Sequence, residues 1–120
     1  MQSNNALEYQ VYQLLKKKHV TLTTAESATG GMIAATLINV PGISEFFTEG
    51  YITYSDEAKI KMIHVSPDTI RTYGVVSSET AADMAKAAAK TAGTAAAVSV
   101  TGVAGPNGGT KECPVGRVFI

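Results

Sequence analysis

Residues 20–31 read VTLTTAESATGG, and this stretch decides the fold because it joins a strand to a helix. The β-branched residues of 20–25 predict a short strand, and we expect the next helix to begin at Thr29 or Gly30. Ser27 then lies on the turn between them, with two glycines close behind. Such a turn exposes a hydroxyl beside the free N–H groups of a helix start, which favour negative charge.

The alternation of helices and strands continues along the rest of the chain. Further strands are predicted at residues 50–54, 95–100 and 115–120, and further helices follow starts near Leu7, Ser55, Pro67 and Ser77. The first helix carries one apolar stripe, formed by Leu7, Val11, Leu14 and Leu15. We therefore expect one α/β domain over residues 1–120, with a mixed or largely parallel sheet and helices on both faces.

The chain ends inside a predicted strand. Val118, Phe119 and Ile120 are all apolar, and no polar residue follows them. An uncovered apolar strand edge is costly in water. We expect that the domain is truncated at its C-terminal end, and that a protein of this length is either less stable than a longer form or covers the edge by forming a homo-oligomer.

Composition narrows the class of protein and its compartment. Lys plus Arg and Asp plus Glu each number 10, so no net charge attracts nucleic acid or an anionic membrane. Cys113 is the one cysteine, which excludes an internal disulfide and a cysteine-based zinc site. Residues 1–5 lack a signal-peptide pattern, and no apolar run reaches membrane-spanning length. We expect a cytoplasmic protein without membrane or direct nucleic-acid binding and, since carboxylates and histidines do not cluster, without a metal site.

A lysine on an apolar helix face provides a candidate base for Ser27. Lys59 lies on the side of its predicted helix that carries Ile63, whereas Lys61 points the opposite way. Either the Lys59 stem lies along apolar surface with its charge in water, or burial lowers the amine pKa so that it can accept the serine proton. Tyr54 ends the preceding predicted strand, where its hydroxyl either relays a proton or serves only in packing. Taken alone, Ser27 is an ordinary helix cap or phosphate contact.

Three other features receive weaker interpretations. The glycine-rich loop at residues 101–114 follows a buried strand, where open α/β sheets bind ligands, but it matches neither a P-loop nor a dinucleotide motif. Glu26 faces away from Ser27 and is interpreted as structural support. His19 and His64 are expected at surface positions near helix ends.

The motifs together resemble a known family, the C-terminal domain of the competence/damage-inducible protein CinA, also called the nicotinamide-nucleotide amidase family. The motifs that carry the resemblance are TAESATGG, VPGISEFFTEGYITYSDEAK, YGVVSSETAADMA and VTGVAGPNGGTKECPVG, in the family's order and spacing. The resemblance covers nearly the whole chain. Ala28 stands where many members have cysteine, and a later substrate-binding arginine of the family has no counterpart before Ile120.

The resemblance implies hydrolysis of the carboxamide of nicotinamide mononucleotide, a small-molecule nucleotide, with no cofactor and no metal. By motif, the catalytic set is Ser27, Tyr54 and Lys59. The remaining expected site residues hold the oxyanion or contact the substrate: backbone N–H groups of Thr29, Gly30 and Gly31 at the oxyanion, Thr101 in the site, and Gly102, Ala104 and Gly105 at the ribose or phosphate.

Two other functions stay open at the level of sequence. The chain can be a nucleotide-binding module without catalysis, because a fold does not fix an activity. A role in DNA uptake or repair is suggested by the family name alone, and the absence of a basic stripe argues against direct DNA binding. Ammonia release from nicotinamide mononucleotide distinguishes an amidase from a non-catalytic nucleotide-binding module. A salt-dependent gel shift tests for DNA binding.

Overall fold

A four-stranded sheet forms the centre of the computed structural model, which describes residues 5–120; the part of the polar N-terminal stretch in residues 1–4 lies outside the described residues. The strands follow the order β2-β1-β3-β4 and comprise β1 (Leu22–Glu26), β2 (Tyr51–Ile52), β3 (Ala96–Gly102) and β4 (Val118–Phe119). β1 runs parallel to β2 and to β3, and β4 runs antiparallel to β3. The sheet is therefore mixed and mostly parallel, as the sequence predicted.

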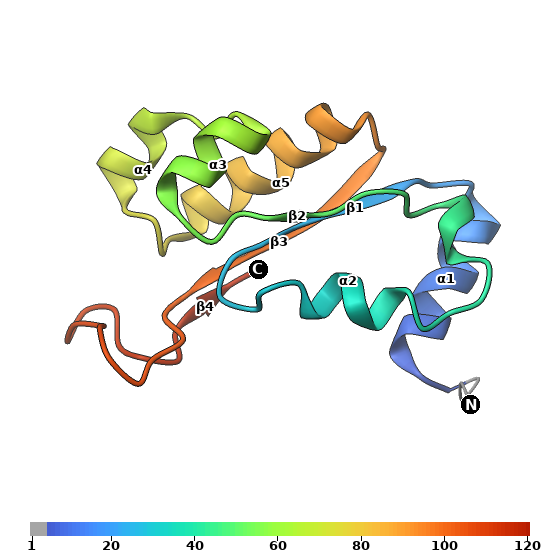
Figure 1. Cartoon of the computed structure of the whole chain (residues 1–120), viewed down its shortest axis with the longest axis horizontal. Helices are drawn as coiled ribbons and strands as arrows, with labels where there is room; N and C mark the ends of the chain where they lie inside the picture. Colours follow the sequence, from blue (N-terminus) through green and yellow to red (C-terminus); the bar gives the residue numbers. More distant parts are fainter. Residues whose placement is uncertain (1–4) are drawn as a thin grey trace.

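The helices cover both faces of this sheet (Figure 1). On one face lie α1 (Leu7–Lys18), α2 (Met32–Leu37) and a short 3-10 turn at Ile43–Glu45. On the other face lie α3 (Asp56–Ile63), α4 (Pro67–Tyr73) and α5 (Ser78–Ala92). The expected arrangement of helices on both faces is confirmed.

Two apolar clusters, one on each face, share β1 between them. The cluster on the side of α1 and α2 consists of Leu15, Leu22, Leu37, Val40, Ile43, Phe46 and Phe47. The cluster on the side of α3 and α5 consists of Ala25, Ile63, Val65, Met84 and Ala88. Because successive strand residues point to opposite faces, β1 contributes Leu22 to the first cluster and Ala25 to the second.

Several predicted boundaries and one predicted face were wrong. Leu7 and Leu14 are exposed on α1, where Leu15 is the buried residue and Tyr12 packs beside it. β2 ends at Ile52, so Tyr54 lies beyond the strand. β3 continues through Gly102 instead of ending at residue 100, because β4 pairs with its last two residues.

The helix after β1 begins later than predicted, and a side chain from the strand caps it. α2 begins at Met32 instead of residue 29 or 30, since Gly31 has φ +104°, a conformation that glycine adopts without strain. The buried Glu26 carboxylate accepts hydrogen bonds from the N–H groups of Ile33 and Ala34, at 2.7 and 2.9 Å, and from the Thr29 hydroxyl at 2.7 Å. The interpretation of Glu26 as structural support is confirmed.

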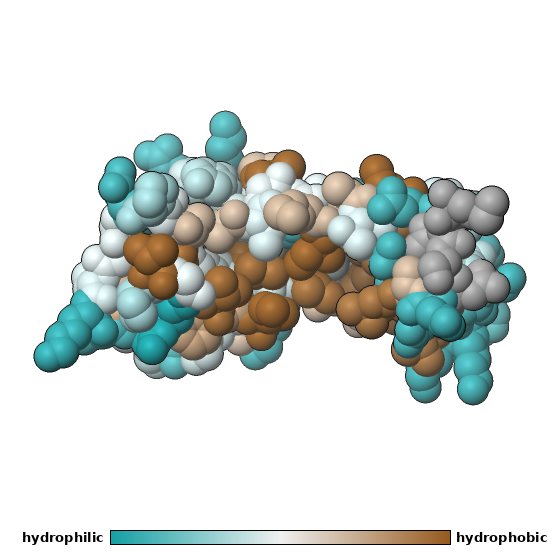
Figure 2. Space-filling view, turned by 90° about the horizontal axis from the view of Figure 1, so that it is seen from below, coloured by the Kyte–Doolittle hydropathy of each residue, from teal (hydrophilic) through white to brown (hydrophobic). Residues whose placement is uncertain are grey.

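Apolar side chains gather on the surface shown in Figure 2, which views the molecule from the α2 side of Figure 1. Large apolar side chains that are more than half exposed in the structure include Leu7, Met32, Ile38 and Ile120. Surfaces of this kind mark contacts with other molecules or with further chain. Formation of a homo-oligomer stays a prediction, and this exposed apolar surface is a candidate contact for it.

We expect Glu26→Ala to destabilise the protein by about 3 kcal/mol, because two backbone N–H groups and one hydroxyl lose their acceptor. Glu26→Gln retains one carbonyl oxygen and should lose less. Urea denaturation followed by circular dichroism measures both. Glu45→Ala removes an exposed carboxylate and serves as the control, with an expected change below about 0.5 kcal/mol. Equal effects at Glu26 and Glu45 would contradict the capping role.

Candidate active site

Ser27 lies at the carboxyl end of β1, where the parallel strands β2 and β3 also end. Its N–H donates to the Val100 carbonyl at 3.0 Å and so continues the ladder beyond the last strand residue. Because Glu26 points toward α2, its neighbour Ser27 points to the opposite face, where α3 lies. The serine is 8% exposed, so its hydroxyl borders solvent without being surrounded by it.

Lys59 reaches this hydroxyl from α3. Its side chain is 1% exposed, and its Nζ donates to the Thr53 carbonyl at 2.8 Å and to Ser27 Oγ at 3.3 Å. Burial lowers the pKa of the Lys59 amine, and the nearby Asp56 carboxylate partly opposes this effect. No carboxylate in the described chain forms an ion pair with Lys59. Of the two sequence-based alternatives for Lys59, the buried amine is confirmed, and Lys61 is exposed.

These side chains line one cavity of about 210 Å³ at the carboxyl ends of the strands. The lining residues are Ser27, Ala28, Tyr54, Asp56, Lys59, Val75, Val76, Thr101, Gly102 and Ala104. This volume lies below the ~300–1,000 Å³ of typical ligand pockets, so the cavity can enclose only part of a larger ligand. Six residues proposed from the sequence, from three separate segments, are thus brought together.

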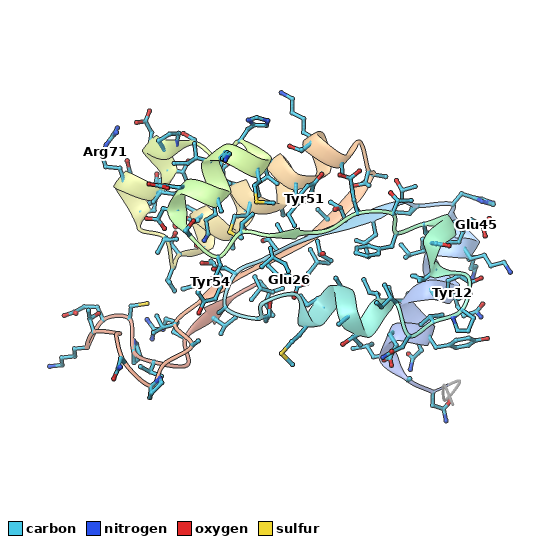
Figure 3. All side chains as sticks on the ribbon, viewed as in Figure 1. Tyr12, Glu26, Glu45, Tyr51, Tyr54 and Arg71 are labelled. Carbon is cyan, nitrogen blue, oxygen red and sulfur yellow. The ribbon has the colours of Figure 1, made fainter. Side chains whose placement is uncertain are left out.

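Tyr54 lines the same cavity from its open side. Its side chain is 68% exposed, and it forms no hydrogen bond with Ser27 or Lys59. Figure 3 shows Tyr54 and Glu26 at the same end of the sheet, away from Tyr12 and Glu45 at the other end. Tyr54 is therefore placed to contact a bound molecule more readily than to pass a proton between Ser27 and Lys59.

Thr101 and Gly102 enter the cavity from the end of β3. The Thr101 hydroxyl donates to the Val75 carbonyl at 2.8 Å, which ties β3 to the loop before α5. A Cβ on Gly102 would lie 2.8 Å from the Arg117 carbonyl oxygen, so glycine is needed here for the close approach of the segment leading into β4. These contacts give both residues a structural role in shaping the cavity wall.

Four predicted residues do not line the cavity: Thr29, Gly30, Gly31 and Gly105. The Gly30 N–H donates to the Ser27 carbonyl at 2.9 Å, and Glu26 occupies the first N–H groups of α2. The Gly30 N–H is therefore not free, whereas the assignment of oxyanion donors to Thr29 and Gly31 stays a prediction. Gly105 packs against Val115 in the loop before β4. Ala28 lines the cavity, and its N–H makes no hydrogen bond with any residue that the structure describes.

Sequence reasoning missed three lining residues, Asp56, Val75 and Val76. Asp56 carries a signal that could have found it, since its spacing of three from Lys59 places both on one side of a helix. Val75 and Val76 lie in a short connection without a periodic pattern. Only the fold brings them beside Ser27.

Residues 5–120 contain neither a candidate metal centre nor a candidate membrane-spanning helix. No group of three or more histidine, cysteine, aspartate or glutamate side chains is arranged to hold a metal ion there. None of the helices in that range has the length and apolar character needed to cross a bilayer.

The geometry is suited to nucleophilic chemistry at Ser27. A lysine that has lost its proton can accept the proton of a hydroxyl within hydrogen-bond reach. Lys59 Nζ is 3.3 Å from Ser27 Oγ, somewhat longer than a tight hydrogen bond. The serine also opens onto a cavity that can admit a small electrophile.

Comparisons with known proteins agree on one family. The family model "CinA C-terminal domain" matches residues 4–120. A protein of Clostridium acetobutylicum whose name refers to competence-damage induction is 56% identical over 117 residues, and a "CinA-like protein" of Kosmotoga olearia is 50% identical over 115 residues. The matches cover 98% and 96% of this chain but 28% of each relative, so the chain spans under a third of these proteins.

Solved structures give the same result. The competence/damage inducible protein CihA from Agrobacterium tumefaciens superposes with a TM-score of 0.86 at 40% identity, over 93% of this chain and 68% of that one. A CinA superfamily protein from Klebsiella pneumoniae gives a TM-score of 0.89 at 35% identity, over 98% of this chain and 73% of that one. At these identities the likeness extends to the family as well as to the fold.

The burial of Lys59 predicts a specific dependence of stability on pH. Between its lowered pKa in the folded protein and the usual value of 10.5, the unfolded chain binds more protons, so stability rises with pH. We expect the free energy of unfolding of the wild type, relative to Lys59→Met, to increase over this range by up to about 1.4 kcal/mol per pH unit.

Denaturant titrations at several pH values measure this difference. Lys61→Met removes an exposed amine from the same helix. Its free energy of unfolding should differ from that of the wild type by the same amount at every pH. A constant offset for Lys59→Met as well would show that the Lys59 amine titrates normally.

Proposed function

Because the chain belongs to the CinA C-terminal domain family, we propose that it hydrolyses the carboxamide of nicotinamide mononucleotide to nicotinic acid mononucleotide and ammonia. The observation that supports this best is the Ser27 hydroxyl, 3.3 Å from the buried Lys59 amine and open to a cavity. An unprotonated amine beside a serine is a known way to activate a hydroxyl when no histidine is present. The chain has two histidines, His19 and His64, which are exposed at the C-terminal ends of α1 and α3 and do not line the cavity.

The proposed reaction has two stages. Ser27 Oγ bonds to the carboxamide carbon while its proton moves to Lys59 Nζ, and the carbonyl oxygen becomes an oxyanion. The C–N bond then breaks, and the leaving amine takes the proton from Lys59 and departs as ammonia. Water next attacks the carbonyl carbon of the acyl-serine and gives a proton to the Lys59 amine. The bond between this carbon and Ser27 Oγ then breaks, the proton returns from Lys59 to Ser27, and the carboxylic acid is released.

A backbone donor next to the nucleophile suits the oxyanion. The Ala28 N–H follows Ser27 directly, as in other serine hydrolases in which the residue after the nucleophile supplies such a donor. Removing one oxyanion donor typically costs about 3 kcal/mol of barrier. Ala28 thus takes the part first expected of Gly30, whose N–H is bonded within the turn.

Tyr54 and Ala104 contribute at the substrate side of the cavity. The exposed ring of Tyr54 offers a surface on which an aromatic ring can stack. Ala104, on the opposite segment, leaves room for the ribose. In this proposal Tyr54 orients the substrate, and Lys59 alone exchanges the proton with Ser27.

We expect the purified chain to release ammonia from nicotinamide mononucleotide, and Ser27→Ala to reduce the rate at least about a thousandfold, as loss of a nucleophile does in other hydrolases. The measurements are a coupled ammonia assay and detection of the acid product. Ser99→Ala, a buried serine bonded to the Ala81 carbonyl outside the cavity, is the matched control and should retain activity once folded. Binding of the nucleotide without ammonia release would favour a non-catalytic module.

We expect Lys59→Ala to be inactive and Lys61→Ala to retain near-normal activity, because only Lys59 contacts Ser27. The wild-type rate should rise with pH as Lys59 loses its proton, with a midpoint below 10.5 because burial lowers its pKa. A pH–rate profile measures this midpoint. Equal losses in both variants, or a rate that falls with rising pH, would contradict the assignment of Lys59 as the base.

A further inference from the structure

The cavity beside Ser27 has an uneven distribution of charge. Its lining includes two charged side chains, Asp56 and Lys59, and its other polar side chains are the hydroxyl groups of Ser27, Tyr54 and Thr101. Lys59 is buried at the inner end, and Asp56 is exposed at the start of α3. The two lie one helical turn apart on the same side of α3, so both face a molecule bound at Ser27.

Asp56 is not neutralised by another side chain. Within residues 5–120, the only ion pair joins Arg71 to Asp68 on α4, and no hydrogen bond engages the Asp56 carboxylate. The one nearby cation is Lys59, which donates to Thr53 and Ser27. The carboxylate is therefore available to a charged group of the ligand.

We propose that Asp56 is a specificity residue that favours substrates whose amide-bearing ring is a cation, such as an N-substituted pyridinium, over substrates with an uncharged ring. This proposal rests on the deamidation proposed above. An amide carbon held at Ser27 places its ring within the same small cavity, so the ring charge and the Asp56 carboxylate interact at short range.

Loss of the proton from Lys59 strengthens this preference. When Lys59 is neutral and able to accept the serine proton, Asp56 alone sets the charge of the cavity lining, which is then negative. A cationic ring compensates that charge, whereas an uncharged ring does not. Tyr54 is the other titratable group in the lining.

Asp56 also affects the proposed base, Lys59, but in a direction that disfavours its neutral form. Its negative charge favours the protonated form of Lys59 and so raises the pH at which the amine becomes neutral. Removing the charge should therefore weaken binding of a cationic ring while moving the pH dependence of kcat to lower pH. A purely structural role of Asp56 in capping α3 would not separate KM and kcat in this way.

The test uses two forms of one nucleotide that differ in ring charge. Oxidised nicotinamide mononucleotide has a pyridinium ring, and its reduced form has an uncharged dihydropyridine ring with the same ribose and phosphate. Calorimetry with Ser27→Ala, which prevents turnover, measures the affinity for each form. Asp56→Asn added to this background should weaken binding of the oxidised form by roughly three- to fivefold, as expected for a solvated charge pair, and leave the reduced form unchanged.

Glu57→Gln is the matched control. Glu57 is the next residue of the same first turn, is exposed, and lies outside the cavity, so it has the same influence on the α3 dipole. Its removal should change neither affinity. A second measurement needs only the Ser27→Ala protein, in which added salt should reduce the preference for the oxidised form.

The outcomes separate this inference from the proposed function. One outcome is that the wild type releases ammonia while Asp56→Asn weakens binding of both nucleotide forms equally, or of neither form. In that case the specificity role of Asp56 is wrong and the proposed deamidation stands. If the wild type releases no ammonia, deamidation is wrong, and the affinities of the two forms still decide whether Asp56 selects a cationic ring. A shift of the kcat profile to lower pH in Asp56→Asn supports the assignment.

Discussion

The alternation of side chains at the end of β1 is the constraint on which the site depends. Glu26 points to one face of the sheet and binds the first N–H groups of α2, while Ser27 points to the other face and meets Lys59. The carboxylate thereby holds the turn that presents the hydroxyl. A shift of one residue in strand register would exchange the two side chains and leave a carboxylate beside a buried amine instead of a nucleophile.

A buried amine without an ion-pair partner is costly, and the fold offsets this cost through hydrogen bonds. Lys59 donates to the Thr53 carbonyl, which belongs to the segment that joins β2 to α3. The strand end, the helix and the serine are thus held by one side chain. The same burial that lowers the lysine pKa gives the amine its capacity to accept a proton, so the structural cost and the proposed chemistry have one origin.

The charges at the cavity divide into an inner and an outer part. Lys59 is enclosed next to Ser27, whereas Asp56 faces solvent one helical turn earlier. The inner group is suited to proton transfer, and the outer group is the one that we propose to interact with the ring of a bound substrate. This division needs only one helix, because residues three apart on α3 reach different depths of the same cavity.

The sequence by itself determined the α/β class, the helix that carries Lys59, and the pairing of Ser27 with that lysine, because periodicity, caps and the family motifs are local signals. It assigned the oxyanion to the N–H groups of Thr29, Gly30 and Gly31, but could not reveal that the Gly30 N–H is bonded to the Ser27 carbonyl within the turn. It also missed Val75, whose connecting loop has no pattern. Only the tertiary structure decided these points, because hydrogen-bond partners and cavity walls come from segments distant in the chain.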